Sequence, residues 1–303
     1  MSEEGGEKPS NALLYGAIAA MTLFWSLNYI VGKVALREFP PPLLAGLRVT
    51  FAALLVLPLY WWRNRRVASV QPPAGAAPGR SIFVLLGLAG VALNQLFFTM
   101  GLNRTSVAHT SILIATSPIM VLLIVAARGM ERLTAGKVIG MLIALAGVAA
   151  LNAAPAGGAR ATLAGDALVL AGAFCFAVFT AAAKRVTVWH DSVTVTALAY
   201  ASGAAFLIPV TLWQSAGFDY SRVSLAAWAG VLYMAAFPSV VCYLIFYWAM
   251  TYISASRVSS FSYLQPPIAT LLALPLLGEG VTGWLALGGA LVIGGVFLTE
   301  RAR

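Results

Sequence analysis

The sequence has little charge and few cysteines. Charged residues make up 10% of its 303 positions and hydrophobic residues 60%, whereas a soluble protein carries roughly a quarter charged residues. The two cysteines, Cys175 and Cys242, both lie inside apolar runs. They carry no information on disulfides or redox compartment, and we interpret them as packing residues. This composition excludes an ordinary soluble domain.

The sequence also lacks the motifs of nucleotide-driven, metal-dependent and hydrolytic proteins. It has no Walker A sequence, and nothing in it resembles a nucleophile elbow. The two histidines, His109 and His190, are far apart and have no cysteine or carboxylate at ligand spacing, so we expect no metal site. We therefore expect no cofactor and no enzymatic activity. An intramembrane enzyme and a passive channel stay open as alternatives.

Instead, the chain consists of apolar runs separated by short polar breaks. A bilayer core of about 30 Å needs about 20 apolar residues per helix. We predict an all-α polytopic membrane protein with ten transmembrane helices, a polar tail at 1–11 and a short tail at 300–303. The expected spans are 12–32, 41–62, 81–103, 107–128, 134–151, 163–185, 191–213, 223–250, 255–276 and 281–299.

The basic residues indicate how the spans are oriented. If the N-terminus is cytoplasmic, twelve Lys and Arg residues fall in inside segments and five in outside segments. The net charge of +9 is thus a topology signal, and no nucleic-acid partner is expected. We predict that both termini are cytoplasmic and that the lipid bilayer is the main partner.

An internal repeat divides the chain into 12–151 and 163–299. The aligned pairs are Pro118 with Pro266, Glu131 with Glu279 and Gly147 with Gly295 at a shift of 148 residues, and Lys33 with Lys184 and Trp62 with Trp213 at a shift of 151. Because each half has an odd number of spans, the second half enters the membrane from the opposite side. We therefore predict two inverted five-helix repeats, a common secondary-transporter architecture.

The repeated stretches also resemble a known family. The stretches similar to the EamA domain are Leu23 to Lys33, Leu47-Arg48, Thr105 to Pro118, Glu131-Arg-Leu-Thr and Gly140 to Gly147, and then Ser254-Ala-Ser, Pro266, Gly278-Glu279 and Gly288 to Gly295. The chain resembles the ten-helix drug/metabolite transporter superfamily over nearly its whole length, and within it the bacterial exporters of aromatic amino acids. The resemblance implies export of a small-molecule substrate across the bacterial inner membrane. One departure is Ala199, which stands where the first half has Arg48.

Aromatic and amide residues on shared helix faces are the candidates for substrate binding at the midplane. An aromatic cavity with a few amides suits a neutral amphipathic solute, such as a zwitterionic amino acid with a large side chain. Ordinary packing or an interface belt is the alternative for each aromatic. The candidates are Trp25, Asn28, Asn94, Gln95, Phe98, Tyr243, Tyr247, Trp248, Tyr263 and Gln265.

The basic and titratable groups within the spans each have two interpretations. Arg48 either snorkels to the outer interface or binds a substrate carboxylate. Lys33 and Lys184 either anchor span ends at the interface or contact substrate. His109 is either a satisfied core residue or a pH-sensitive gate or substrate hydrogen-bond donor.

Prolines and carboxylates complete the candidate machinery. Pro118, Pro266 and Pro267 remove backbone hydrogen bonds within two spans, and we expect them to act as hinges. Glu131 and Glu279 each precede a span, where a helix N-terminus favours an anion, so they either cap a helix or form a gate contact. No carboxylate is expected at mid-span to carry protons.

The sequence thus predicts a secondary transporter that exports amino acids and related metabolites by alternating access. A single chain is sufficient to form the pathway. A broader drug/metabolite transporter, or a sugar-phosphate or nucleotide transporter of the same fold, is the alternative.

Overall fold

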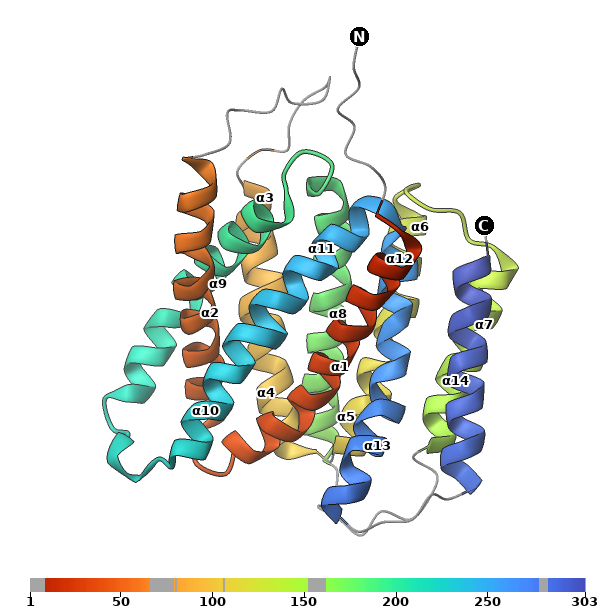
Figure 1. Cartoon of the computed structure of the whole chain (residues 1–303). Helices are drawn as coiled ribbons and strands as arrows, with labels where there is room; N and C mark the ends of the chain where they lie inside the picture. Colours follow the sequence, from red (N-terminus) through yellow and green to blue (C-terminus); the bar gives the residue numbers. More distant parts are fainter. Residues whose placement is uncertain are drawn as a thin grey trace.

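The computed structural model describes residues 9–65, 79, 81–105, 107–151, 162–277 and 283–302. Every regular element within these residues is helical, and the helices form one bundle (Figure 1). α1 begins and α14 ends at the same end of the bundle, the upper end in Figure 1. The prediction of an all-α protein is confirmed for this part of the chain.

The first half of the chain holds five helical segments. Three of them are single helices: α1 (Asn11–Ala35), α2 (Pro41–Asn64) and α7 (Ala135–Leu151). The third segment is one continuous run made of α3 (Ser81–Leu85), π-helix η1 (Leu86–Leu93) and α4 (Asn94–Arg104). The fourth consists of α5 (Val107–Ile114) and α6 (Ser117–Ala127), which a short break separates.

The second half has a matching series. Its single helices are α8 (Leu163–Val186), α9 (Ser192–Ser215) and α14 (Gly283–Arg301). One continuous run consists of α10 (Leu225–Met234), π-helix η3 (Ala235–Val241) and α11 (Cys242–Tyr252). A second continuous run consists of α12 (Ala255–Ser260), the 3-10 turn η4 (Phe261–Leu264) and α13 (Gln265–Leu277). A 3-10 turn, η2 (Tyr220–Arg222), precedes α10.

Six of the described helical segments are long and apolar enough to cross a membrane. They are Asn11–Ala35, Pro41–Asn64, Ser81–Arg104, Leu163–Val186, Ser192–Ser215 and Leu225–Tyr252, and shorter apolar helices cover Ser117–Ala127, Ala135–Ala150 and Leu287–Thr299. Large apolar side chains such as Leu225 and Trp213 are exposed on the outside of the bundle, as expected for a surface that faces lipid.

Side-chain caps fix where several helices begin. Ser10, Thr162 and Ser224 each accept a hydrogen bond from the backbone N–H three residues later, which satisfies a donor that the first helical turn leaves unpaired. Asp191 does the same for α9. The π-helical turns η1 and η3 are not predicted by the sequence, because the apolar runs that contain them show no local signal for a wider helix.

Pairs of helices from opposite halves pack against each other. α2 packs on α9, α4 on α8, and α1 on α10 and α11. The most extensive contact is that of α7 with α14, where a Cβ on Gly295 would lie 2.5 Å from the backbone N of Ala144 and 2.5 Å from the carbonyl oxygen of Gly140. Small residues let the two backbones approach this closely.

Candidate functional site

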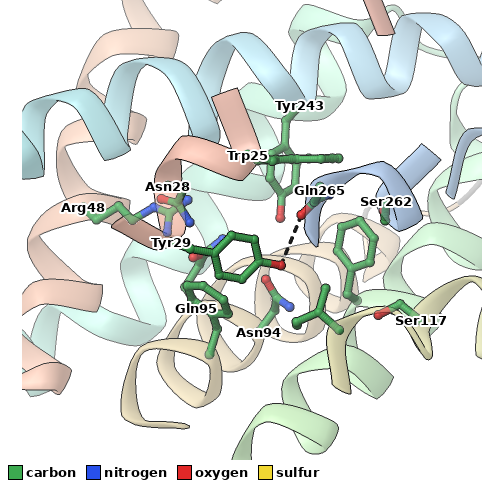
Figure 2. A pocket seen from close by; sticks show the side chains of 13 residues that line it. Trp25, Asn28, Tyr29, Arg48, Asn94, Gln95, Ser117, Tyr243, Ser262 and Gln265 are labelled. Atoms are coloured by element: carbon green, nitrogen blue, oxygen red, sulfur yellow. Dashed lines mark hydrogen bonds between the residues drawn. The ribbon is translucent and has the colours of Figure 1, made fainter. Parts of the chain in front are cut away.

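A cavity of about 80 Å³ lies in the middle of the bundle (Figure 2). It has room for several water molecules, since one water needs roughly 10–15 Å³ by this measure. Helices from both halves supply its walls. The lining residues are Trp25, Asn28 and Tyr29 of α1, Arg48 of α2, Asn94, Gln95 and Phe98 of α4, Ile114 of α5, Ser117 of α6, Phe176 of α8, Tyr243 of α11, Ser262 of η4 and Gln265 of α13.

Helical spacing explains why neighbouring side chains reach the cavity together. Residues three or four apart share a helix face, which places Trp25 beside Asn28 and Tyr29, and Asn94 beside Phe98. Cross-helix hydrogen bonds then fix two of these side chains. The Tyr29 hydroxyl donates to Gln265 Oε1 at 3.2 Å (Figure 2), and Asn94 Nδ2 donates to the Gly172 carbonyl at 2.9 Å.

Arg48 is the charged side chain among the described lining residues. Its side chain is only 2% exposed, and its Nε donates to Ser239 Oγ at 2.8 Å. Ser239 Oγ in turn donates to the Met234 carbonyl at 2.8 Å. The snorkelling interpretation of Arg48 is therefore wrong, because this face of α2 is covered by helices of both halves and the guanidinium is directed into the bundle.

Two aromatic side chains of the cavity bind backbone carbonyls in the π-helical turns. Trp25 Nε1 donates to the Pro238 carbonyl of η3 at 3.0 Å, and the Tyr243 hydroxyl donates to the Gly90 carbonyl of η1 at 3.2 Å. π-helical turns are frequent at functional sites. Here the carbonyls of the two wide turns hold aromatic rings at the cavity wall.

The structure brings together eight of the sequence-predicted site residues: Trp25, Asn28, Arg48, Asn94, Gln95, Phe98, Tyr243 and Gln265. Three predicted residues do not line the cavity. Tyr247 packs on Phe179 in the core, Trp248 contacts Tyr252, and Tyr263 belongs to a cluster with residues of α7 and α14. His109 lies in α5, but its side chain is outside the described part of the structure.

Five lining residues were missed from the sequence: Tyr29, Ile114, Ser117, Phe176 and Ser262. The repeat contained a signal for some of them. A shift of 151 residues from Trp25 leads to Phe176, and a shift of 148 residues back from Gln265 leads to Ser117. Ile114 and Ser262 are also separated by 148 residues.

The predicted hinge prolines lie at helix breaks that touch the cavity. Pro118 lies in the first turn of α6, and Pro266 follows η4 at the start of α13. A proline cannot donate to the carbonyl four residues earlier. Those carbonyls belong to Ile114 and Ser262, which both line the cavity.

Glu131 binds a helix N-terminus in the other half of the chain. It accepts hydrogen bonds from the backbone N of Ser256 at 3.1 Å and from the Ser256 hydroxyl, and it pairs with Lys137 at 3.0 Å. Burial favours the neutral form of this carboxyl, but the bonds from Ser256 and Lys137 outweigh it, so the pKa of Glu131 is lowered. Glu131 therefore caps α12 rather than the helix that follows it. Its predicted counterpart Glu279 lies outside the described residues.

Lys33 and Lys184 have a role that neither interpretation anticipated. Lys33 Nζ donates to the carbonyls of Leu102 and Thr105 at the end of α4. Lys184 Nζ donates to the carbonyls of Met250 and Ile253 at the end of α11. Both lysines satisfy carbonyls that a helix C-terminus leaves unpaired, and neither lines the cavity.

Comparisons with known proteins give the family of the chain. The EamA-like transporter family matches residues 12–153 and 163–301. The uncharacterized transporter YetK of Bacillus subtilis is 28% identical over 290 residues, which cover 94% of this chain and 86% of the relative. The probable terminal-alkyne amino-acid exporter of Streptantibioticus cattleyicolor is 30% identical over 220 residues, which cover 73% of each chain.

Two further comparisons agree with this family and its fold. The uncharacterized inner membrane transporter YedA of Escherichia coli K12 is 26% identical over 279 residues, which cover 91% of this chain and 87% of the relative. A crystal structure with 21% sequence identity has a TM-score of 0.74 and covers 95% of this chain and 96% of that chain, which shows a shared fold. The names of these relatives are those of transporters. This multi-pass membrane protein therefore belongs to the EamA-like transporter family.

Proposed function

We propose that the protein is a secondary transporter in which two inverted five-span repeats rock around the central cavity. The observation that carries the proposal is the pairing of the cavity residues. The pairs related by the repeat are Trp25 with Phe176, Gln95 with Tyr243, Ile114 with Ser262 and Ser117 with Gln265. A cavity built from equivalent positions of two repeats is the expected site for alternating access.

Equivalent contacts elsewhere in the bundle support the same proposal. Lys33 and Lys184 are repeat mates, and the carbonyls that they bind, Leu102 with Met250 and Thr105 with Ile253, are repeat mates as well. The Gly90 and Pro238 carbonyls, which hold Tyr243 and Trp25, are also separated by 148 residues. The lysine contacts of one half are thus repeated in the other, and the carbonyls that hold the two rings stand at equivalent positions.

The substrates that we propose are neutral amino acids and related amphipathic metabolites, exported from the bacterial cytoplasm. The aromatic walls would hold the apolar side chain of the substrate, and the amides and Arg48 would hold its polar end. A relative that is named an amino-acid exporter supports this class. Sugar phosphates or nucleotides are less suited, because Arg48 is the lining cation among the described residues.

The size of the cavity sets a condition on larger substrates. At about 80 Å³ it is smaller than the cavity of about 150 Å³ that admits benzene. An aromatic amino acid would therefore enter only after the walls move apart, as they do when a transporter opens to one side.

A counterflow assay tests this function. Proteoliposomes preloaded with an unlabelled amino acid should take up the same labelled amino acid faster than empty ones, and uptake should saturate. A passive channel would give flux without saturation or counterflow. An intramembrane enzyme would convert the solute and move none.

The inverted arrangement makes a separate prediction about topology. Reporter fusions after Arg303 and within segment 152–162 are expected to report opposite sides of the membrane, with the C-terminus cytoplasmic, because the two sites are separated by five spans. Insertion of the reporter after residue 5 serves as a control for the N-terminal side. The same side for 152–162 and Arg303 would exclude inverted repeats.

The prolines at the helix breaks make a prediction about rate. Pro118→Ala and Pro266→Ala restore a donor for the carbonyls of Ile114 and Ser262, so each broken segment becomes stiffer. We expect the maximal transport rate to fall by roughly 3- to 10-fold while half-saturation changes little, because stiffness affects switching more than binding. Pro58→Ala, at a proline inside α2 and away from the cavity, is the control. Wild-type transport rates in both variants would mean that the prolines contribute to packing and not to conformational switching.

A further inference from the structure

Arg48 carries a charge that the described protein does not neutralise. Its Nε is bound to Ser239, but its Nη1 is buried and has no hydrogen-bond partner. Arginine stays protonated in proteins and prefers a carboxylate with matching geometry. Both atoms belong to a side chain that lines the central cavity.

The carboxylates whose side chains the structure describes have partners elsewhere. Glu38 binds Ser224, Glu131 binds Lys137, Asp166 binds Thr105, Asp191 lies 3.6 Å from Arg63, and Asp219 lies 2.9 Å from Arg222. The groups that surround Arg48 are instead neutral side chains, those of Tyr200, Tyr233, Cys242 and Tyr243. No carboxylate whose side chain is described in the structure thus serves as the counter-ion of Arg48.

A charge inside a membrane bundle is costly unless it pairs with an opposite charge. An arginine at this position is therefore suited to pair with an anionic group that arrives with the substrate. A carboxylate in the cavity would accept a charge-assisted hydrogen bond from Nη1, which is stronger than a bond between neutral groups.

Asn28 adds an acceptor to the same cavity. Its Oδ1 is buried and has no hydrogen-bond partner, although the residue is only 6% exposed. Figure 2 shows Arg48 extending from α2 toward α1, where Asn28 is located. A carboxylate cannot satisfy a carbonyl oxygen, but an ammonium group can. One wall of the cavity therefore offers a cationic donor together with a neutral acceptor.

We propose that Arg48 and Asn28 form a subsite for the zwitterionic head group of an α-amino acid, with the carboxylate on Arg48 Nη1 and the ammonium group on Asn28 Oδ1. The proposal rests on the transporter function proposed above and adds what the substrate must carry. The apolar side chain then lies against Trp25, Phe98 and Phe176.

This subsite predicts an order of affinity for related ligands. An amine that lacks the carboxylate leaves Arg48 unpaired and adds a second positive charge beside it. A carboxylic acid that lacks the ammonium group keeps the ion pair and leaves only Asn28 unsatisfied. The amino acid therefore binds most tightly, the carboxylic acid less tightly and the amine least tightly. A ligand that leaves a buried polar group of the site without its partner loses much of its affinity.

Competition for counterflow in proteoliposomes tests the ranking. Leucine, 4-methylpentanoate and 3-methylbutylamine form one series, and phenylalanine, 3-phenylpropanoate and phenethylamine form a larger one. We expect the amine to compete at least 100-fold less well than its amino acid, and the acid about 10-fold less well. Arg48→Met should abolish the preference for the amino acid over the amine, and Arg48→Lys should keep part of it. Arg222→Gln, which removes an exposed arginine, should keep all of it.

The outcomes separate this proposal from the transporter function. Amines that compete as well as amino acids in the wild-type protein, or a preference that survives in Arg48→Met, overturn the subsite. Counterflow of nucleosides or sugars without any effect of amino acids also overturns it, while the transporter function stands. If Arg48→Met does not fold, the ligand series on the wild-type protein decides alone.

Discussion

Gly295→Leu is expected to force α7 and α14 apart and to destabilise the protein by about 3 kcal/mol or more. A side chain at this position starts 2.5 Å from the backbone N of Ala144 and 2.5 Å from the Gly140 carbonyl, so backbone atoms, rather than a flexible side chain, would have to move. Overpacking of a well-packed contact costs about 1–3 kcal/mol, and a clash with backbone lies at the upper end. Thermal unfolding in detergent should show a midpoint lower by roughly 6 °C or more.

The neighbouring residue provides a matched control. A Cβ on Gly294 meets nothing within 4 Å, so Gly294→Leu introduces the same side chain one position earlier in the same helix without a clash. We expect a midpoint within about 1 °C of the wild type, since substitutions on an exposed surface are usually within about 0.5 kcal/mol. Leucine has a higher helix propensity than glycine, so propensity alone would destabilise neither variant. Equal losses in the two variants would therefore contradict the close approach of the helices as the cause.

Glu131→Ala is expected to cost about 3–5 kcal/mol, because it leaves Lys137 as an unpaired charge in a poorly exposed position. The two side chains are 9% and 8% exposed, and the carboxylate also holds the first turn of α12 through Ser256. Glu131→Gln, which keeps an acceptor for Ser256, should cost less. Asp219→Ala, at an ion pair whose members are 54% and 86% exposed, is the control and should cost about 1 kcal/mol or less.

The lowered pKa of Glu131 also predicts that the stability contributed by this carboxyl depends on pH. A carboxyl whose pKa is lower in the folded protein than its ordinary value of 4.5 contributes its stabilisation above that value. The contribution is lost as the pH falls below about 4.5 and through the folded-state pKa. The stability difference between wild type and Glu131→Gln should therefore be constant from neutral to mildly acidic pH and shrink in stronger acid. A difference that shrinks already near neutral pH would contradict the assignment.

The positions of the helices could be predicted because a membrane helix is a local property of an apolar run. The side of each helix that faces the cavity is not local. Gln95 and Trp248 are both polar or amphipathic residues on helices that border the cavity, yet only Gln95 lines it. The wide turns of η1 and η3 rotate α4 and α11 relative to the helical residues before them, so a regular helical period does not carry across.

The role of Arg48 was ambiguous for a related reason. A single arginine in an apolar run can extend to the interface or stay inside, and the choice depends on what covers that helix face. The residue that holds it, Ser239, is 191 positions away in the sequence. The internal repeat reaches across such distances. Trp25 and Gln265 are predicted residues that line the cavity, and the repeat relates them to Phe176 and Ser117, which line it as well. The residue types of Phe176 and Ser117 did not single them out.

The pairing of α7 with α14 also has a consequence for biosynthesis. α7 ends at Leu151, and α14 begins at Gly283, so the ribosome must add roughly 130 residues before the partner helix exists. At about 5–20 residues per second this takes on the order of 10 s. During that interval the glycine face of α7 has no partner from its own chain. α14, which is synthesised long after α7, thus covers a face of the first half, and chains truncated before Gly283 are expected to be recognised by membrane quality control.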